Sequence, residues 1–291
     1  MNKPLKIAIA RAGEGKKLAY YPGCSLSSAG RPYDMSLKAV LKHLGIPFAE
    51  MKDWTCCGSF AAAAQDPLLA GVLPLSNLRL AAFDGCSDIL IPCPECYSRF
   101  RKSLEDYSEN GNLSRKMDDV LESHSPAAKP VHPLEIFSGF SPGEIKRDLS
   151  KIKAVCYYGC LLVRPPEISG VDDCENPRKM ELILRACGMQ TADWECRTDC
   201  CGGSLSISSP ETEERLSETI IDSALEAGAD CIVTACQMCQ MNLEVCRKNR
   251  KKNLPVLYFT QIMGLAMGLK PSILGFGSNL VDAENLLKKV E

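Results

Sequence analysis

Ten of the 17 cysteines form two series that share one internal spacing. Each series has a single cysteine, a gap of 31 or 39 residues, an adjacent pair followed by glycine, a gap of 35 or 34 residues, and a C-x-x-C motif. Partners are offset by 136, 144, 144, 143 and 143 positions. Such a repeat predicts a duplicated structural unit. The two series are Cys24, Cys56, Cys57, Cys93 and Cys96, and Cys160, Cys200, Cys201, Cys236 and Cys239.

The segments around these cysteines also repeat, and they indicate strands that alternate with helices. Each series opens with a β-rich run that ends in Gly-Cys, which we interpret as a strand delivering its cysteine to a loop. A helix with a glycine cap follows, and later an apolar strand runs directly into the C-x-x-C motif. A last strand is expected after a polar helical stretch. The matching segments are 18–24 and 154–160, 33–46 and 176–189 (capped by Gly45 and Gly188), 87–96 and 229–239, and 131–137 and 255–259.

This alternation predicts an α/β fold that is built twice. We expect two pseudo-symmetric domains, each a small parallel β-sheet flanked by helices, with the cysteine sites in loops at the C-terminal ends of the strands. The segment FSGFSPGEIKRD places the boundary near residue 145. The predicted domains are therefore an N-terminal one over 1–145 and a C-terminal one over 146–291, each with a core of its own.

The charge and hydropathy of the chain argue against a nucleic-acid-binding, secreted or membrane-spanning protein. The chain has 34 basic and 36 acidic residues, so no basic field favours binding to nucleic acid or an anionic membrane. The apolar run Ile7–Ala10 is too short for a signal peptide, and no apolar stretch is long enough to span a membrane. We therefore expect a cytoplasmic protein. In a reducing cytosol, clustered cysteines favour metal binding or redox chemistry over structural disulfides.

The number of thiols in each series bears on the kind of metal centre. A C-x-x-C motif alone also suits a tetrahedral zinc site, which needs four ligands. Each series here offers five cysteines, two of them adjacent, and a glycine after the pair permits a sharp turn of the chain. Iron–sulfur chemistry fits five thiolates better than one zinc ion does, although structural zinc stays an alternative.

Other residues that could suggest chemistry have simpler interpretations. The seven cysteines outside the series are expected to be small core residues, and the three histidines show no metal-ligand spacing. Arg164 could contact an anionic substrate group but is expected to be a surface arginine. The Gly-x-Gly runs at 13–15 and 275–277 complete no nucleotide-binding motif and are interpreted as turns. The segment 264–268 is expected to serve ordinary packing or docking on a partner subunit. The seven cysteines and three histidines are Cys86, Cys156, Cys174, Cys187, Cys196, Cys231, Cys246, His43, His124 and His132.

The spacing of C, then C-C-G, then C-x-x-C resembles that of the cysteine-rich CCG domain. Two copies in a chain of this length, over residues 18–260, are similar to the family of heterodisulfide reductase B subunits. The resemblance implies that each set of five cysteines binds a non-cubane 4Fe-4S cluster, so that the iron–sulfur sites lie in the loops described above. It implies no flavin or nucleotide in this chain. It also implies that the two clusters face each other across one cleft.

The same resemblance implies an oxidoreductase acting on a disulfide, as part of a complex that serves anaerobic metabolism. Family members reduce the heterodisulfide of coenzyme M and coenzyme B, or a related small disulfide, to two thiols. Electrons come from an iron–sulfur C subunit and a flavin-containing A subunit, since this chain has neither a ferredoxin cysteine run nor a flavin motif. The alternative is an electron-relay or docking CCG subunit of another dehydrogenase or reductase complex.

Overall fold

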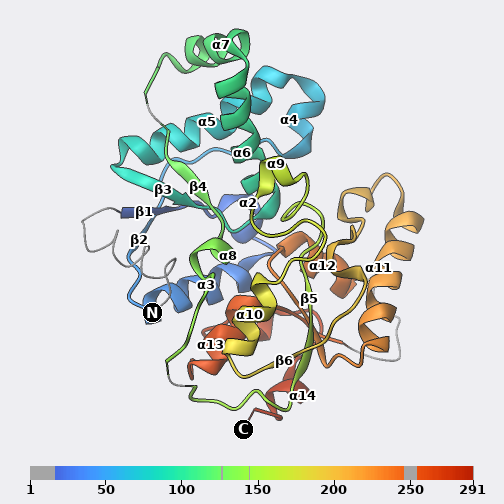
Figure 1. Ribbon diagram of the computed structural model, residues 1–291. Coiled ribbons are helices and arrows are strands. Elements are labelled where there is room, and N and C mark those ends of the chain that lie inside the picture. Colours follow the sequence, from blue (N-terminus) through green and yellow to red (C-terminus); the bar gives the residue numbers. More distant parts are fainter. Residues whose placement is uncertain (1–16, 126, 144, 246–253, 291) are drawn as a thin grey trace.

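The computed structural model describes residues 17–125, 127–143, 145–245 and 254–290. Its framework is two four-stranded parallel sheets with the orders β2-β1-β3-β4 and β6-β5-β7-β8. Helices flank both sheets, which confirms the predicted fold class (Figure 1). The strands are β1 (Lys17–Tyr20), β2 (Phe48–Glu50), β3 (Cys86–Leu90), β4 (Lys129–Val131), β5 (Lys153–Tyr157), β6 (Gln190–Thr191), β7 (Cys231–Thr234) and β8 (Val256–Tyr258).

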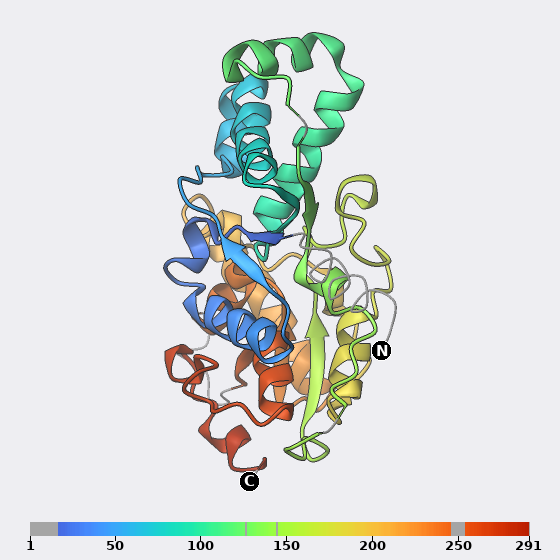
Figure 2. The same cartoon turned by 90° about the vertical axis from the view of Figure 1, so that its left-hand side faces the viewer.

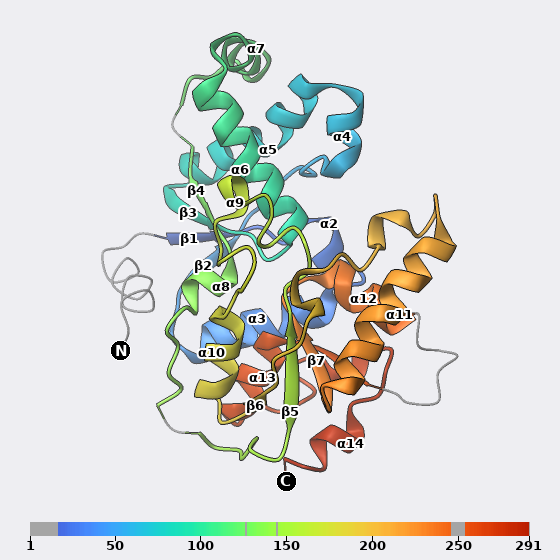
Figure 3. The same cartoon turned by 45° about the vertical axis from the view of Figure 1, so that its right-hand side comes forward.

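The helices of the first half fall into two groups. Figures 1 and 3 show α4 to α7 gathered at one end of the molecule, whereas α3 lies beside helices of the second half. Within this group, the start of α5 is marked by clear local signals. The Asp66 side chain caps the helix, and Pro67 occupies its first turn. The helices are α2 (Gly23–Leu26), α3 (Arg31–His43), α4 (Ser59–Gln65), α5 (Pro67–Phe83), α6 (Pro94–Glu109), α7 (Gly111–Leu121) and α8 (Pro133–Ile136).

The second half repeats the order of strands and of most helices of the first half. The predicted helices over 33–46 and 176–189 correspond to α3 and α10, and Gly45 and Gly188 follow them with φ of 65° and 81°. These left-handed conformations confirm both glycine caps. The helices are α9 (Pro166–Ser169), α10 (Lys179–Ala186), α11 (Pro210–Glu226), α12 (Gln237–Val245), α13 (Phe259–Ala266) and α14 (Glu284–Leu287), with short 3₁₀ turns η1 (Cys196–Thr198), η2 (Gly203–Leu205) and η3 (Phe276–Ser278).

One expected strand, 131–137, is only partly correct. Strand β4 ends at Val131, and α8 begins at Pro133. Between them His132 forms a capping box: its Nδ1 accepts from the Leu134 N–H at 3.3 Å, and its own N–H donates to Glu135 Oε2 at 2.7 Å. Cys24 likewise lies in the one-turn helix α2, where a loop was expected.

The expectation of a separate core for each half is wrong. The larger cluster of buried apolar side chains contains residues of both halves, and only a smaller cluster belongs to the second half alone. The seam is α3 against α13, visible in Figure 2. There the rings of Tyr33 and Tyr258 stack with centroids 4.6 Å apart, and Ser36 Oγ lies 2.6 Å from Thr260 Oγ1. The predicted boundary near residue 145 lies between α8 and β5 and stays a prediction.

Within the described ranges, no helix is both long and apolar enough to cross a membrane.

Replacing Tyr33 by alanine should destabilise both halves together, because its ring is fully buried at the seam. We expect a loss of about 3–5 kcal/mol, the range for deleting a large core ring. Tyr33→Phe is the matched control: the Tyr33 hydroxyl is buried without a hydrogen-bond partner among the described residues, so its removal should change stability little. Anaerobic urea unfolding with amide hydrogen exchange measures both. Loss of protection confined to residues before 145 would contradict a shared core.

Candidate functional site

The sheet order brings the cysteines of each set to one edge. Cys24 follows β1, Cys56 and Cys57 follow β2, and Cys93 follows β3. These strands are neighbours in the order β2-β1-β3, and because they are parallel their C-terminal ends share one edge. Strand order reverses between β1 and β3, which is the point where ligands bind in open α/β sheets. The second half repeats this arrangement after β5, β6 and β7.

In the first set, three cysteines are buried and two are exposed. Cys57 and Cys96 are buried with their sulfur atoms 3.0 Å apart, and the Cys96 N–H donates to Cys93 Sγ at 3.5 Å. Cys24 and Cys56 are exposed. Burial raises the pKa of Tyr21, and the nearby thiols of Cys96, Cys57, Cys56 and Cys24 raise it further. Four members of the set are therefore close enough to the Tyr21 hydroxyl to affect its pKa.

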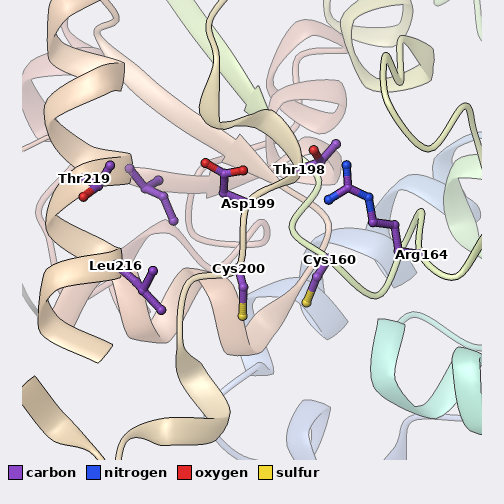
Figure 4. A pocket seen from close by; sticks show the side chains of 8 residues that line it. Cys160, Arg164, Thr198, Asp199, Cys200, Leu216 and Thr219 are labelled. Carbon is purple, nitrogen blue, oxygen red and sulfur yellow. The ribbon is translucent and has the colours of Figure 1, made fainter. Parts of the chain in front are cut away.

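The second set has the same organisation. The sulfur atoms of Cys201 and Cys239 are 3.7 Å apart, and the Cys239 N–H donates to Cys236 Sγ at 3.5 Å. Cys160 and Cys200 lie on the more accessible side with their sulfur atoms pointing the same way (Figure 4). A hydrogen bond with the Cys160 thiol lowers the pKa of Cys200 to about 6. The geometry of the repeat thus extends to individual sulfur contacts.

The adjacent cysteines separate because the chain turns sharply after them. Gly58 and Gly202 have φ of 84° and 77°, a left-handed conformation that glycine adopts without strain. Each turn directs a backbone N–H back to the first sulfur of the pair, from Gly58 to Cys56 and from Gly202 to Cys200, at 3.4 Å in both halves. The predicted role of these glycines is confirmed.

A second pair of glycines, not singled out from the sequence, leaves space beside the sulfur atoms. Gly23 and Gly159 precede the first cysteine of each series and have φ of 61° and 66°. A Cβ at these positions would lie 3.5 Å from Cys96 Sγ and 3.0 Å from Cys239 Sγ. The signal was available in the repeated Gly-Cys dipeptide. Side chains larger than hydrogen would occupy the room beside the thiols.

The second set opens into a cavity of about 540 Å³ that also has walls from the first half. All five cysteines of the set line it, and Ser59, Phe60 and Glu95 come from the first half. None of the first-set cysteines is among the lining residues, but the lining residue Gln237 donates from Nε2 to Cys93 Sγ at 2.8 Å, so the first set lies next to one wall of the cavity. The lining also includes Ala61, Pro94, Tyr158, Leu161, Gly203, Ser204, Ile207 and Met238.

A smaller pocket of about 320 Å³ lies on another side of Cys160 and Cys200. Arg164 lines it, but the guanidinium contacts both carboxylate oxygens of Glu175 at 3.1 Å. In Figure 4 the side chain extends toward Thr198 and away from the two sulfur atoms. Arg164 is partly exposed, in agreement with the expectation of a surface arginine.

The residues of both sets fit a polynuclear iron–sulfur group. Thiolates are the ligands that iron–sulfur clusters use, and backbone N–H groups already point at four of the sulfur atoms. The glycines before the first cysteines leave room next to the buried thiols. In the part of the chain that the structure describes, no three His, Cys, Asp or Glu side chains are grouped so as to hold a single metal ion.

The cysteines outside the series are mostly buried, as expected of core residues. Burial raises the pKa of Cys156, Cys187 and Cys231, which keeps these thiols protonated. Cys86 and Cys196 are also buried, and Cys174 is half-buried. Cys246 and the 13–15 run lie outside the described residues. The other Gly-x-Gly run contains a turn at Gly275, whose φ is 77°.

One histidine has a positioning role that its sequence context did not indicate. His132 is fully buried, and burial lowers its pKa to about 3, so it is neutral. Since Nδ1 accepts from Leu134, Nε2 carries the proton and donates to the Pro92 carbonyl at 3.2 Å. This bond supports the turn immediately before Cys93. His124 instead contacts Asp118 at the surface.

Comparison with known proteins identifies the family. The model of the CCG cysteine-rich domain matches residues 18–101 and 154–244. The chain belongs to the CCG cysteine-rich domain family. The two matches contain both cysteine sets, and β4 and β8 are the sheet strands that lie outside them. They confirm the duplicated CCG domain predicted from the spacing.

Full-length relatives of this CCG protein are subunits of different reductases. A chain from Wolinella succinogenes, the 8-methylmenaquinol:fumarate reductase membrane anchor subunit, is 30% identical over 93% of this chain and 99% of its own length. The B subunit of the ferredoxin:CoB-CoM heterodisulfide reductase from Methanosarcina mazei is 24% identical over 94% and 97%. Both relatives indicate that the chain is a subunit of an oxidoreductase complex. They belong to two different kinds of reductase, a fumarate reductase and a heterodisulfide reductase.

A solved structure confirms the fold. A hypothetical protein from Helicobacter pylori superposes with a TM-score of 0.75 at 14% identity, covering 92% of this chain. This chain spans about half of that longer one, 52% of its length. At this identity the likeness concerns the fold alone.

Gly159→Ala should lower metal content at the second set, because its Cβ would lie 3.0 Å from Cys239 Sγ. Gly45→Ala is the matched control, since Gly45 has nearly the same φ, 65°, and no atom within 4 Å of the added carbon. Both changes impose about 1–2 kcal/mol of left-handed strain. Iron content of anaerobically purified protein separates the two effects. Equal iron in both variants would show that the space beside Cys239 is not needed.

Proposed function

We propose that this CCG protein is the iron–sulfur subunit of a reductase complex that reduces a small-molecule disulfide to two thiols. Each set of five cysteines would hold one non-cubane 4Fe-4S cluster. The observation that carries this proposal is that the second set lines a cavity whose wall residue Gln237, from the second C-x-x-C, donates a hydrogen bond to Cys93 of the first set. Two redox sites beside one ligand space suit a two-electron reaction.

The reaction balances with electrons from outside the chain. Cleavage of the S–S bond takes up two electrons and two protons and releases two thiols. Clusters bound by the two sets would supply the electrons, one each. The chain itself would hold the disulfide among apolar side chains: Phe60, which is 49% exposed, and Ile207, which is 94% exposed, belong to the cavity lining from opposite halves. Both side chains are accessible to an entering ligand.

The charge of the lining bears on which disulfide binds. Glu95 is the one carboxylate among the described lining residues, and they include no lysine or arginine. Glu95 accepts hydrogen bonds from the Ser59 hydroxyl and the Phe60 N–H, so its charge is stabilised within the first half. A substrate with several anionic groups would be left without cations. This lining therefore favours a small disulfide with little negative charge over the coenzyme M–coenzyme B heterodisulfide.

The electron source in this proposal is a partner complex. By the family resemblance it consists of an iron–sulfur C subunit and a flavin-containing A subunit. We place the chain on the cytoplasmic side. The name of the Wolinella relative, a membrane anchor subunit, instead supports association of such a complex with a membrane through this kind of subunit.

The second candidate is an electron-relay or docking subunit of another reductase complex. The 30% identical fumarate reductase subunit from Wolinella supports it. In that case electrons would pass through the two sets to another chain, and the cavity would bind no disulfide. Direct assay of disulfide reduction distinguishes the two functions.

Metal analysis tests the cofactor in both candidates. Because both five-cysteine sets are complete, the anaerobically purified protein should contain iron and acid-labile sulfide in equal amounts, about eight of each per chain for two four-iron clusters. The protein should absorb visible light. A colourless preparation that contains zinc and no sulfide would indicate the structural zinc alternative.

Losing either set should abolish disulfide reduction. We expect Cys57→Ser and Cys201→Ser each to remove one cluster signal and to slow thiol release by at least about 100-fold, because one electron cannot complete the cleavage. Cys174→Ser is the control, since this cysteine lies outside both sets. The assay supplies electrons from reduced methyl viologen to 2-hydroxyethyl disulfide or the coenzyme M–coenzyme B heterodisulfide. Full cluster content without thiol release from either disulfide would favour the relay function.

A further inference from the structure

Gln237 belongs to the second C-x-x-C motif, but its amide contacts the first cysteine set. The side chain is 3% exposed, and Nε2 donates to Cys93 Sγ at 2.8 Å. It is the first residue of α12 and lies between Cys236 and Cys239 in the sequence. A short hydrogen bond from a neutral amide to a buried sulfur stabilises negative charge on that sulfur.

The opposite half has no equivalent contact, because Pro94 occupies the position that matches Gln237. Both residues directly follow the first cysteine of a C-x-x-C motif, at the repeat offset of 143. Proline carries no side-chain donor, so it cannot reciprocate toward Cys236. The pseudo-symmetry of the two sets is therefore broken at this position, and the difference here is a hydrogen bond to sulfur.

The packing around Gln237 accommodates its side chain but leaves one of its hydrogen-bonding atoms unpaired. A Cβ on Gly30 would lie 2.9 Å from Gln237 Cβ, so glycine at the start of α3 permits the approach of the two halves. Among the described residues Gln237 Oε1 has no hydrogen-bond partner, although it is buried. Leaving such an acceptor unpaired costs about 1–3 kcal/mol.

We propose that Gln237 is a positioning residue that raises the reduction potential of the centre held by the first set above that of the second. The proposal rests on the proposed function, since it takes iron–sulfur centres to be present. Hydrogen bonds to the sulfur ligands favour the reduced, more negative state of such a centre. The first set receives this additional donor from Gln237, and the second set receives none at the matching position.

Replacement of Gln237 by methionine removes the amide and keeps a similar side-chain volume. Anaerobic potentiometric titration followed by electron paramagnetic resonance measures the two centres separately, with signals assigned through Cys57→Ser and Cys201→Ser. We expect the potential of the first-set centre to fall by about 59 mV or more, a tenfold change in its one-electron equilibrium. The second-set centre should stay unchanged. Gln237→Glu should lower the first potential further, because it places a carboxylate near Cys93.

Gln240→Met is the matched control. Gln240 is a buried glutamine on the same helix that accepts a hydrogen bond from the Tyr258 hydroxyl at 3.3 Å, and neither potential should change when it is replaced. Unchanged potentials in Gln237→Met, or equal shifts of both centres, would overturn the proposal. Loss of the first centre in both Gln237 variants would also overturn it, because the role would then be assembly. Absence of iron from the unaltered protein would instead refute the proposed function.

Discussion

The stack of Tyr33 on Tyr258 fixes how the two halves meet, and the geometry of the site depends on it. Both rings are fully buried, and their planes are only 4° apart. Tyr33 lies in the first turn of α3, shortly after Gly30, the residue that packs on Gln237. The same seam therefore sets the distance between Gln237 and Cys93. A rotation of one half against the other would break that hydrogen bond and open the cavity wall.

Each set must also hold several sulfur atoms close together, and the backbone supplies the donors that make this possible. Buried anionic sulfur is unfavourable unless hydrogen bonds compensate for lost water. The left-handed turns at Gly58 and Gly202 each direct one N–H to sulfur, and the starts of α6 and α12 supply another. These donors follow from backbone path alone. Duplication of the path consequently duplicates these backbone donors, whereas side chains such as Gln237 differ between the halves.

The spacing of the cysteines predicted the duplication, and the alternating strand and helix segments around them predicted the parallel fold and the strand edge that carries the cysteines. Contacts between the halves could not be predicted, because the apolar face of α3 does not reveal which sheet it covers, and Tyr33 proved to pack on the second half. In the segment VHPLEIF, residues 131–137, the apolar residues are compatible with a strand or a helix. The capping box at His132 starts the helix α8 there. The contact of Gln237 could not be predicted for the same reason as that of Tyr33: its partner is 144 residues away.

The two cysteine sets are placed differently relative to the shared cavity. All five cysteines of the second set line it, whereas the first set reaches it through Gln237 and the turn that carries Pro94 and Glu95. A ligand in the cavity would therefore meet the second set directly. If both centres were equivalent, electrons arriving from a partner would distribute between them without preference. Under the proposed function, a hydrogen bond present on one side only would make the order of reduction of the two centres a property of the fold, and a two-electron cleavage at one cavity would use such an order.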